Sequence, residues 1–344
     1  MRRFLSFGSS EIRSDSIDLD ELMPSNQHKI IDGRPLTTQL ICLLCVVSCS
    51  SVSAQAPASC PTSASIVQVT SGVYVRPGRH AVVFEGDRIA NIGFIVGDRC
   101  VAVVDTGASV AEGQALDCAI REVTNLPVCY VFNTHVHPDH LLGNLAFERP
   151  GVEFIGHAKL PRALALRGDI YLQRASAYEG RALHESILVF PDRTVTDTVQ
   201  LDIGDRVLTV RAHKTAHTDH DISVVDEKTR TAFLGDLIFL EHIPVMDGSI
   251  NGWIDELEAI AGKSLAFVVP GHGPPRASWS SSAGPTARYL ADLRQKVRAW
   301  IASGGDLASA QDNIGEAGSE DWLLLDRYHR RNVGTAYAEL EWED

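Results

Sequence analysis

A histidine-rich stretch directly after an apolar run is the feature that most constrains this chain. Residues 134–140 read Thr-His-Val-His-Pro-Asp-His, so three imidazoles and one carboxylate fall within a single short loop. The apolar run before it predicts a buried strand. On a loop leaving that strand, His135 and His137 can reach one metal ion, while Asp139 and His140 turn toward a second. The sequence therefore predicts a two-metal loop at a strand end.

Four more polar side chains lie at or just beyond the ends of predicted strands. They are Asp105, His217, Asp236 and His272. Neighbouring strands that end at one edge of a sheet deliver their side chains to a common point. Each of the four, taken alone, reads as an ordinary surface histidine or turn residue. Their order after the histidine cluster makes them candidates for the same metal site.

Short runs rich in Val and Ile, punctuated by Gly, alternate with helical patterns along the chain. Strands are expected at 66–76, 90–96, 100–104, 129–132, 186–190, 198–202, 206–212, 222–226, 231–234 and 265–269. Helices are expected at 110–123, 139–147, 158–183, 253–261 and 286–302. The helical segment 158–183 could form a flap over the site. Together these elements predict an α/β fold, a four-layer αβ/βα sandwich with a C-terminal helical appendage.

The beginning of the chain has the pattern of an export signal. The apolar run 40–49 is about half the length that spans a bilayer. Basic residues precede this run and Ala54-Gln55-Ala56 follows it, as in a secretory signal with its cleavage site. Processing at Cys49 to a lipid-anchored form is an alternative. We expect a periplasmic protein with no transmembrane span in the mature chain.

Four segments follow from these patterns. Residues 1–56 are the export segment, in which 1–22 could be a mis-assigned start, and 57–64 are a linker. A domain at 65–275 carries all the candidate metal ligands. Residues 276–344 form a helical C-terminal extension.

Composition narrows the function classes. The 344 residues carry a formal charge of -13, which disfavours nucleic-acid binding because that depends on neutralising phosphates. Four cysteines lie beyond the export segment: Cys60, Cys100, Cys118 and Cys129. None has the Cys-x-x-Cys spacing of a zinc site. In an oxidising periplasm some of them are expected to pair, but the sequence does not tell which.

The order of the motifs resembles that of the metallo-β-lactamase-fold hydrolase superfamily, over roughly residues 65–275. The resemblance implies three ligands for a first metal: His135, His137 and His217. It implies three for a second metal: Asp139, His140 and His272. Asp236 would bridge the two metals, and Asp105 would be a buried acidic support of the metal loop. We also predict supporting roles for Thr134 and for Asp221, the latter behind His217.

A narrower resemblance extends into the C-terminal extension. Segments 72–78, 133–140, 216–219 and 338–342 resemble the exported quinoprotein relay system zinc metallohydrolases. That family is associated with quinone-cofactor alcohol oxidation. The resemblance implies a quinoprotein dehydrogenase system as a partner, beside a small-molecule substrate.

Five imidazoles and two carboxylates suit two divalent ions, with Zn²⁺ the best match and iron or manganese as alternatives. Two neighbouring cations acidify a shared water, and the resulting bridging hydroxide attacks a carbonyl or phosphoryl centre. Asp139 and Asp236 are the predicted catalytic carboxylates. The sequence thus predicts a binuclear hydrolase acting on a small ester, thioester or lactam-like substrate.

Three alternatives stay open. One is a metal-binding accessory protein of a quinoprotein system with slow or no turnover. A second is a phosphodiesterase, and a third is a β-lactamase. The residues after Asp236 are Leu237-Ile238-Phe239, with no Lys to hold a substrate carboxylate. A carboxylate bridge also matches thioesterases and phosphodiesterases better than lactamases.

Overall fold

The computed structural model describes residues 60, 63–80, 88–184, 187–315, 318 and 321–343. Residues 58–344 form one compact unit. The predicted export segment at 1–56 lies outside the described residues, as does most of the predicted linker at 57–64. None of the helices in the described ranges combines the length and apolar character needed to span a bilayer.

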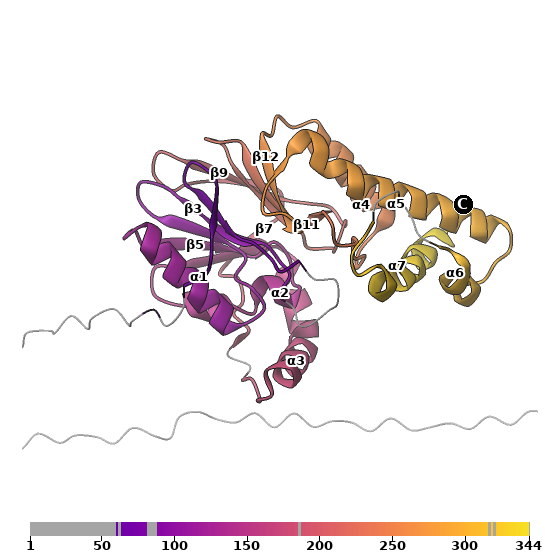
Figure 1. The fold of residues 1–344 in the computed structure, drawn as a ribbon, viewed down its shortest axis with the longest axis horizontal. Helices are drawn as coiled ribbons and strands as arrows, with labels where there is room; N and C mark the ends of the chain where they lie inside the picture. Colours follow the sequence, from indigo (N-terminus) through magenta and orange to yellow (C-terminus); the bar gives the residue numbers. More distant parts are fainter. Residues whose placement is uncertain are drawn as a thin grey trace, which may run out of the picture. The chain divides into compact units, whose positions relative to one another are not determined.

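Two β-sheets form the centre of this unit (Figure 1). The first sheet has its seven strands in chain order: β1 (Val67–Thr70), β2 (Val73–Arg76), β3 (Ile92–Val96), β4 (Val101–Val104), β5 (Val128–Phe132), β6 (Glu153–His157) and β7 (Arg193–Val195). Strands β1 to β4 pair antiparallel, whereas β4 to β7 run parallel. The carboxyl ends of β4 and β5 therefore meet at one edge, where open α/β sheets commonly place their sites.

The second sheet has six strands in the order β13-β12-β11-β10-β9-β8. Their bounds are β8 (Thr198–Asp202), β9 (Val207–Ala212), β10 (Ile222–Asp226), β11 (Thr231–Phe239), β12 (Phe267–His272) and β13 (Ala277–Ser278). Strands β11 and β12 are parallel, and β9 points the same way because β10 is antiparallel to both β9 and β11. All three therefore end at one edge of this sheet.

Helices cover the outer faces of both sheets. Their bounds are α1 (Val110–Val123), α2 (Pro138–Leu141), a 3₁₀ helix (Asn144–Phe147), α3 (Leu160–Glu179), α4 (Ile250–Ala261), α5 (Trp279–Ala302), α6 (Leu307–Asn313) and α7 (Leu325–Leu340). Helix α1 packs on the first sheet through Leu116 and Ile120, while α4 and α5 pack on the second through Trp253 and Tyr289. The predicted four-layer sandwich is confirmed.

The two sheets face each other across an apolar core. Val75 and Phe132 of the first sheet pack in one cluster with Val210 and Phe233 of the second, and all four are at most 2% exposed. Complete burial of such a side chain contributes about 1.5–3 kcal/mol. The sheets are therefore held as rigid plates, which fixes the edges where the candidate ligands lie.

The C-terminal helices share a core with the second sheet. Val333 of α7 belongs to the same buried cluster as Leu237 of β11. The carboxylate of Glu339 accepts hydrogen bonds from Ser249 Oγ (2.8 Å) and Ile250 N (2.7 Å) at the start of α4. A negative group is favourable there because a helix N-terminus carries partial positive charge. The predicted domain division at residue 275 stays a prediction, yet packing runs without a break across it.

Three local predictions differ from the structure. The predicted helix 139–147 is broken into α2 and the 3₁₀ helix, because Gly143 N donates to Gly107 O (3.0 Å) and His140 O accepts from Thr106 N (2.8 Å) instead of continuing the helix. The predicted strand 186–190 is wrong for its described part: 187–190 belong to no strand, and Ile187 packs beneath α3 instead. The predicted strand 66–76 is two strands, β1 and β2, joined by a turn at Ser71 and Gly72.

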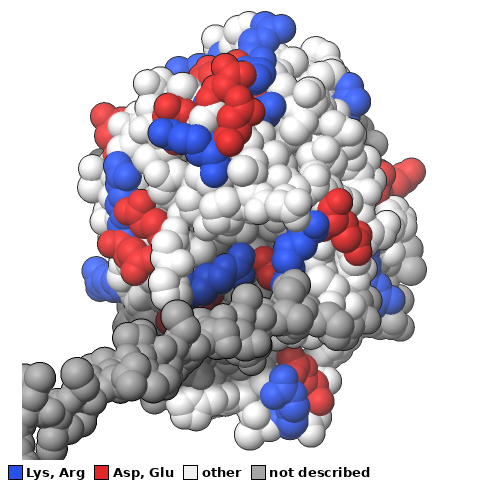
Figure 2. Space-filling model, turned by 90° about the vertical axis from the view of Figure 1, so that its left-hand side faces the viewer, with Lys and Arg blue, Asp and Glu red and all other residues white. Residues whose placement is uncertain are grey.

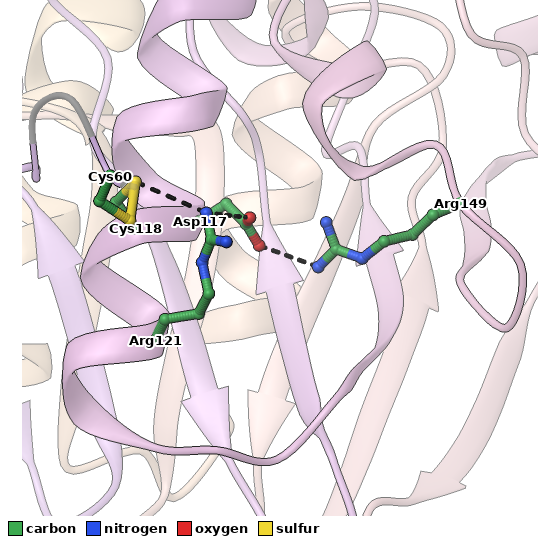
Figure 3. The surroundings of a disulfide bond; sticks show 5 residues. All are labelled: Cys60, Asp117, Cys118, Arg121 and Arg149. Atoms are coloured by element: carbon green, nitrogen blue, oxygen red, sulfur yellow. Dashed lines mark hydrogen bonds and ion pairs between the residues drawn. A yellow bond between two sulfur atoms is a disulfide. The ribbon is translucent and has the colours of Figure 1, made fainter. Parts of the chain in front are cut away.

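Two disulfides tie the first half of the unit together. Cys60 is bonded to Cys118 of α1, and Cys100 is bonded to Cys129 of β5. Figure 3 shows the first bond beside Asp117, whose carboxylate pairs with two arginines of the same region. The Cys60–Cys118 bond spans 58 residues. In the chain-entropy description, a loop of that size corresponds to about 4 kcal/mol of stabilisation.

Candidate metal centre

The first ligand group joins the loop after β5 to the loop after β9. His137 Nδ1 lies 3.0 Å from His135 Nε2 and 3.1 Å from His217 Nε2. The three rings stand nearly perpendicular to one another, with interplanar angles of 82–90°. A tetrahedral zinc ion bonds imidazole nitrogen at about 2.0–2.1 Å, which places ligand atoms roughly 3.3 Å apart. The structure thus brings this predicted group together around one point.

The second ligand group lies beside the first. Asp139 and His140 come from the first turn of α2, and His272 is the last residue of β12. Asp139 Oδ2 lies 3.5 Å from His272 Nε2 and 3.8 Å from His140 Nε2. Two elements far apart in the chain therefore supply a second set of converging ligand atoms.

Asp236 of β11 stands between the two groups. Its Oδ2 lies 3.4 Å from His217 Nε2, while its Oδ1 lies 3.1 Å from His140 Nε2 and 3.2 Å from His272 Nε2. Each carboxylate oxygen thus faces one group. Gly271 makes room for this carboxylate, because a Cβ there would lie 2.0 Å from Asp236 Oδ1. The arrangement is that of a bridging carboxylate.

The residues present fit a pair of divalent cations. His140 Nε2 and Asp236 Oδ1 are buried, and neither completes a hydrogen bond within the part of the chain that the structure describes. A buried polar atom without a hydrogen-bond partner raises the free energy of the folded state, so these two atoms require a partner. Five imidazoles and two carboxylates are donors that zinc accepts. A cation in each group would satisfy both atoms.

Asp105 supports the metal loop from behind. Its carboxylate accepts hydrogen bonds from Thr134 N and Thr134 Oγ1, both at 2.8 Å, and contacts His140 Nδ1 at 2.8 Å. The backbone of Asp105 has φ +57°, a left-handed conformation that costs of order 1–3 kcal/mol outside glycine. These contacts offset that strain. Asp105 and Thr134 therefore lie directly behind the loop that carries the candidate ligands.

The remaining imidazoles are also oriented by their outer nitrogen atoms. His217 Nδ1 donates to Val245 O (2.7 Å), and His272 Nδ1 donates to Ile89 O (3.2 Å). A carbonyl oxygen only accepts, so each ring carries a proton on Nδ1 and turns Nε2 toward the other ligand atoms. Such outer contacts fix the tautomer and direction of metal-binding histidines.

Asp221 lies one step further from the ligands. Its carboxylate accepts hydrogen bonds from Thr218 N (2.8 Å) and Thr218 Oγ1 (2.5 Å), not from the imidazole of His217. Burial raises the pKa of Asp221 to about 7. It shapes the loop that carries His217, whereas the imidazole itself is oriented by Val245.

Other histidine and aromatic side chains near the ligands lie either in the core or at the cavity. His213 is buried between Glu256 and Ser223, and none of these three lines the cavity described below. Phe239 lines that cavity and stacks on His272, with ring centroids 5.0 Å apart. Trp253 is core, and its indole nitrogen donates to a backbone carbonyl.

Sequence reasoning missed Asp247. Its carboxylate contacts His137 Nε2 at 3.1 Å and pairs with Arg167 of α3 and with Arg331 of α7. Burial raises the pKa of Asp247, but the contacts with His137 and Arg167 prevail and hold it well below its usual range. Asp247 stands in a loop without a motif, 110 residues beyond its histidine, so no local pattern could have found it.

Burial and charge act differently on the two groups of imidazoles. In the first group, burial lowers the pKa of His135 well below its usual value and that of His217 to about 3. In the second group, burial also opposes protonation, but the carboxylates of Asp236 and Asp105 prevail and raise the pKa of His140. A cation entering the second group would therefore displace a proton.

The metal centre forms the floor of a cavity of about 1050 Å³. His137, Asp139, Asp236 and His272 reach it from the floor. Its walls come from the segment 167–178 of α3, from the chain between β11 and α4, and from the first turns of α7. The helix predicted as a flap over the site does line the site.

Comparison with curated proteins finds none that matches this chain. Among solved structures, the metallo-beta-lactamase from Pontibacter korlensis is similar, with a TM-score of 0.52 and 19% identity over 66% of this chain and 99% of that one. The sec-alkylsulfatase Pisa1 from Pseudomonas sp. gives a TM-score of 0.64 and 14% identity over 81% of this chain, but only 51% of its own. Such likenesses show the fold. The family described as the metallo-beta-lactamase superfamily matches residues 86–272, more than half of the chain, so the protein belongs to this superfamily of metal-dependent hydrolases.

Proposed function

We propose that the protein is an exported, binuclear metal-dependent hydrolase that acts on a small ester, thioester or lactam-like substrate. One observation carries this proposal: the two oxygens of Asp236 face separate ligand groups, each completed by three other side chains. A carboxylate placed between two donor sets holds two cations close together. We propose Zn²⁺ for both positions, with iron or manganese as alternatives.

Different residues of the chain have different roles in the proposed reaction. Two bound divalent cations would acidify a water molecule and polarise a substrate oxygen. Asp139 is the one acidic ligand at the start of α2, its side chain is 13% exposed, and it lines the cavity, so its Oδ2 can take up a proton. Phe239 covers His272 with its ring and limits the access of bulk water to that side.

Location and partner are part of the proposal. Two disulfides support an oxidising compartment, and therefore export to the periplasm. The similarity of segments 72–78, 133–140, 216–219 and 338–342 to quinoprotein relay metallohydrolases supports an association with a quinoprotein oxidation system.

Metal analysis and a substrate panel test this function together. We expect two divalent ions per chain and turnover of at least one ester, thioester or lactam. Asp139→Ala should lower kcat by about 100-fold or more, as removal of an acid–base group does. The matched control is Asp255→Ala, an exposed position on α4 away from the cavity.

Three outcomes would change the proposal. A metal-loaded protein that cleaves none of the panel contradicts a hydrolase of this kind and favours the accessory protein. Cleavage of bis(p-nitrophenyl) phosphate alone identifies a phosphodiesterase. Activity that survives Asp139→Ala unchanged removes this carboxylate from the mechanism.

A further inference from the structure

The walls of the cavity carry a second chemical feature beside the metal centre. Four arginines line it: Arg167 and Arg174 of α3, and Arg327 and Arg331 of α7. The two helices lie far apart in the sequence. The pair on α3 is two helical turns apart and the pair on α7 is one turn apart, so each pair lies on one face of its helix. We call these four residues the arginine wall.

Asp247 fixes two members of the wall. Arg167 pairs with its Oδ2, and Arg331 Nη2 lies 3.3 Å from its Oδ1. The same carboxylate contacts His137 of the first ligand group at 3.1 Å. The wall is therefore tied to the floor of the cavity at a defined distance, which is a condition for holding one part of a substrate while another part reacts.

Among the described residues that line the cavity, the arginines outnumber the carboxylates. In the described part of the lining there are three carboxylates: the candidate metal ligands Asp139 and Asp236, and Asp247. Four guanidinium groups thus face a single carboxylate that metal binding does not engage. On the face shown in Figure 2, by contrast, basic and acidic side chains lie interspersed, and the whole chain carries -13. A cavity of opposite sign to its protein attracts and orients anions.

Much of the remaining described lining is apolar. Ile170 and Tyr178 of α3, Phe239 and Ile243 near the floor, and Leu324 at the start of α7 border the same space. Ile170 and Tyr178 are 43% and 56% exposed, although surface helices usually place such side chains inward. A cavity of about 1050 Å³ with this lining suits an organic molecule that is apolar along its body.

We propose that the arginine wall binds an oxyanion carried by the substrate, a carboxylate, sulfate or phosphate monoester group at the end of an apolar body opposite the bond that is cleaved. This inference rests on the proposed hydrolase function and names its substrate class as amphipathic anions. Guanidinium groups suit this task because their planar donors match the oxygens of such groups two at a time. Asp247 pairs with Arg167 and Arg331, so Arg174 and Arg327 can be exchanged without breaking those two pairs.

Binding measurements test the wall without turnover. Hexanoate, hexyl sulfate and hexyl phosphate serve as probes, with hexan-1-ol as the neutral probe, in calorimetric titrations of the purified full chain in both zinc-loaded and chelator-treated forms. We expect the anions to bind more tightly than the alcohol, and binding to weaken as NaCl is raised. The double variant Arg174→Gln/Arg327→Gln should raise the Kd of the anions about tenfold or more in both forms.

A matched double variant controls for loss of charge. Arg162→Gln/Arg330→Gln removes one exposed arginine from each of the same two helices, outside the cavity lining. It should leave the Kd values unchanged. Comparing the three anions tells which oxyanion the wall prefers. Melting temperatures of both double variants show that a loss of binding does not arise from unfolding.

The outcomes separate this inference from the proposed function. Anions that bind no better than hexan-1-ol, or equally well to the Arg174→Gln/Arg327→Gln variant, overturn the wall even if the enzyme hydrolyses neutral esters. Wall-dependent binding by a protein that hydrolyses nothing upholds the wall and removes the hydrolase. When both hold, the variant raises KM for anionic esters and leaves KM for neutral esters as it was.

Discussion

The floor and the arginine wall of the cavity are built by different means. The floor takes its side chains from strand ends and the loops beside them, where two packed sheets fix each position within a rigid core. The wall takes its side chains from the exposed faces of α3 and α7, and Asp247 pairs with one arginine of each helix. We infer that the floor determines the reaction and the wall determines the choice of substrate. Substitutions in the floor and substitutions in the wall should therefore have different effects on metal content and on substrate binding.

The largest effect is expected at the centre of the floor. Asp236→Ala removes the carboxylate shared by both ligand groups, so the metal content should fall from two ions to at most one per chain. Activity should fall by more than the roughly 10- to 100-fold that loss of an outer contact costs. Elemental analysis and kcat measure this, with Asp255→Ala as control. Two tightly held ions in the variant would refute a bridging role.

A smaller effect is expected at Asp105, which contacts the candidate ligand His140 from behind. Asp105→Asn keeps the shape and tolerates the left-handed backbone, because Asn is among the residues that adopt it most readily. An amide cannot accept at both positions that face Thr134 and His140. Metal affinity should therefore fall about 10- to 100-fold. Competition with a chelating dye gives the affinity, and an unchanged value would show that this carboxylate only fills space.

Asp247→Asn probes the link between the floor and the wall. The substitution weakens the hold on His137 and leaves Arg167 and Arg331 without their carboxylate. We expect a loss of metal affinity of about tenfold or less, since only one ligand loses an outer contact. KM for anionic esters should change together with it. A change in one property without the other would show that floor and wall are independent.

The smallest effect is expected at Glu339, which belongs to neither the floor nor the arginine wall. Glu339→Gln removes the charge that Glu339 places at the start of α4, which should lower the free energy of unfolding by about 0.3–1 kcal/mol. Metal content and substrate binding should not change. Urea denaturation measures the difference, with Glu341→Gln, an exposed neighbour, as control. A loss of metal in the Glu339 variant would mean that the C-terminal helices position the floor.

The same contrast explains what the sequence could predict. The floor was predictable because each of its side chains follows an apolar run, and spacing places them at one sheet edge. The break at Gly143 and the packing of Ile187 under α3 were not, since both depend on contacts with distant segments. The arginine wall could not be predicted from the sequence for the same reason. Arginines on a helix are ordinarily solvated, and only the fold shows that Arg174 and Arg327 border one cavity.

Helix α7 serves two purposes on two of its faces. Arg327 and Arg331 line the cavity. Val333, Ala336 and Leu340 pack in the core shared with the second sheet. Evolution or a protein engineer could therefore retune ligand preference by exchanging residues on the first face alone. Trimming the chain to a minimal catalytic fragment would instead bare the apolar underside of that sheet, and such a fragment should aggregate.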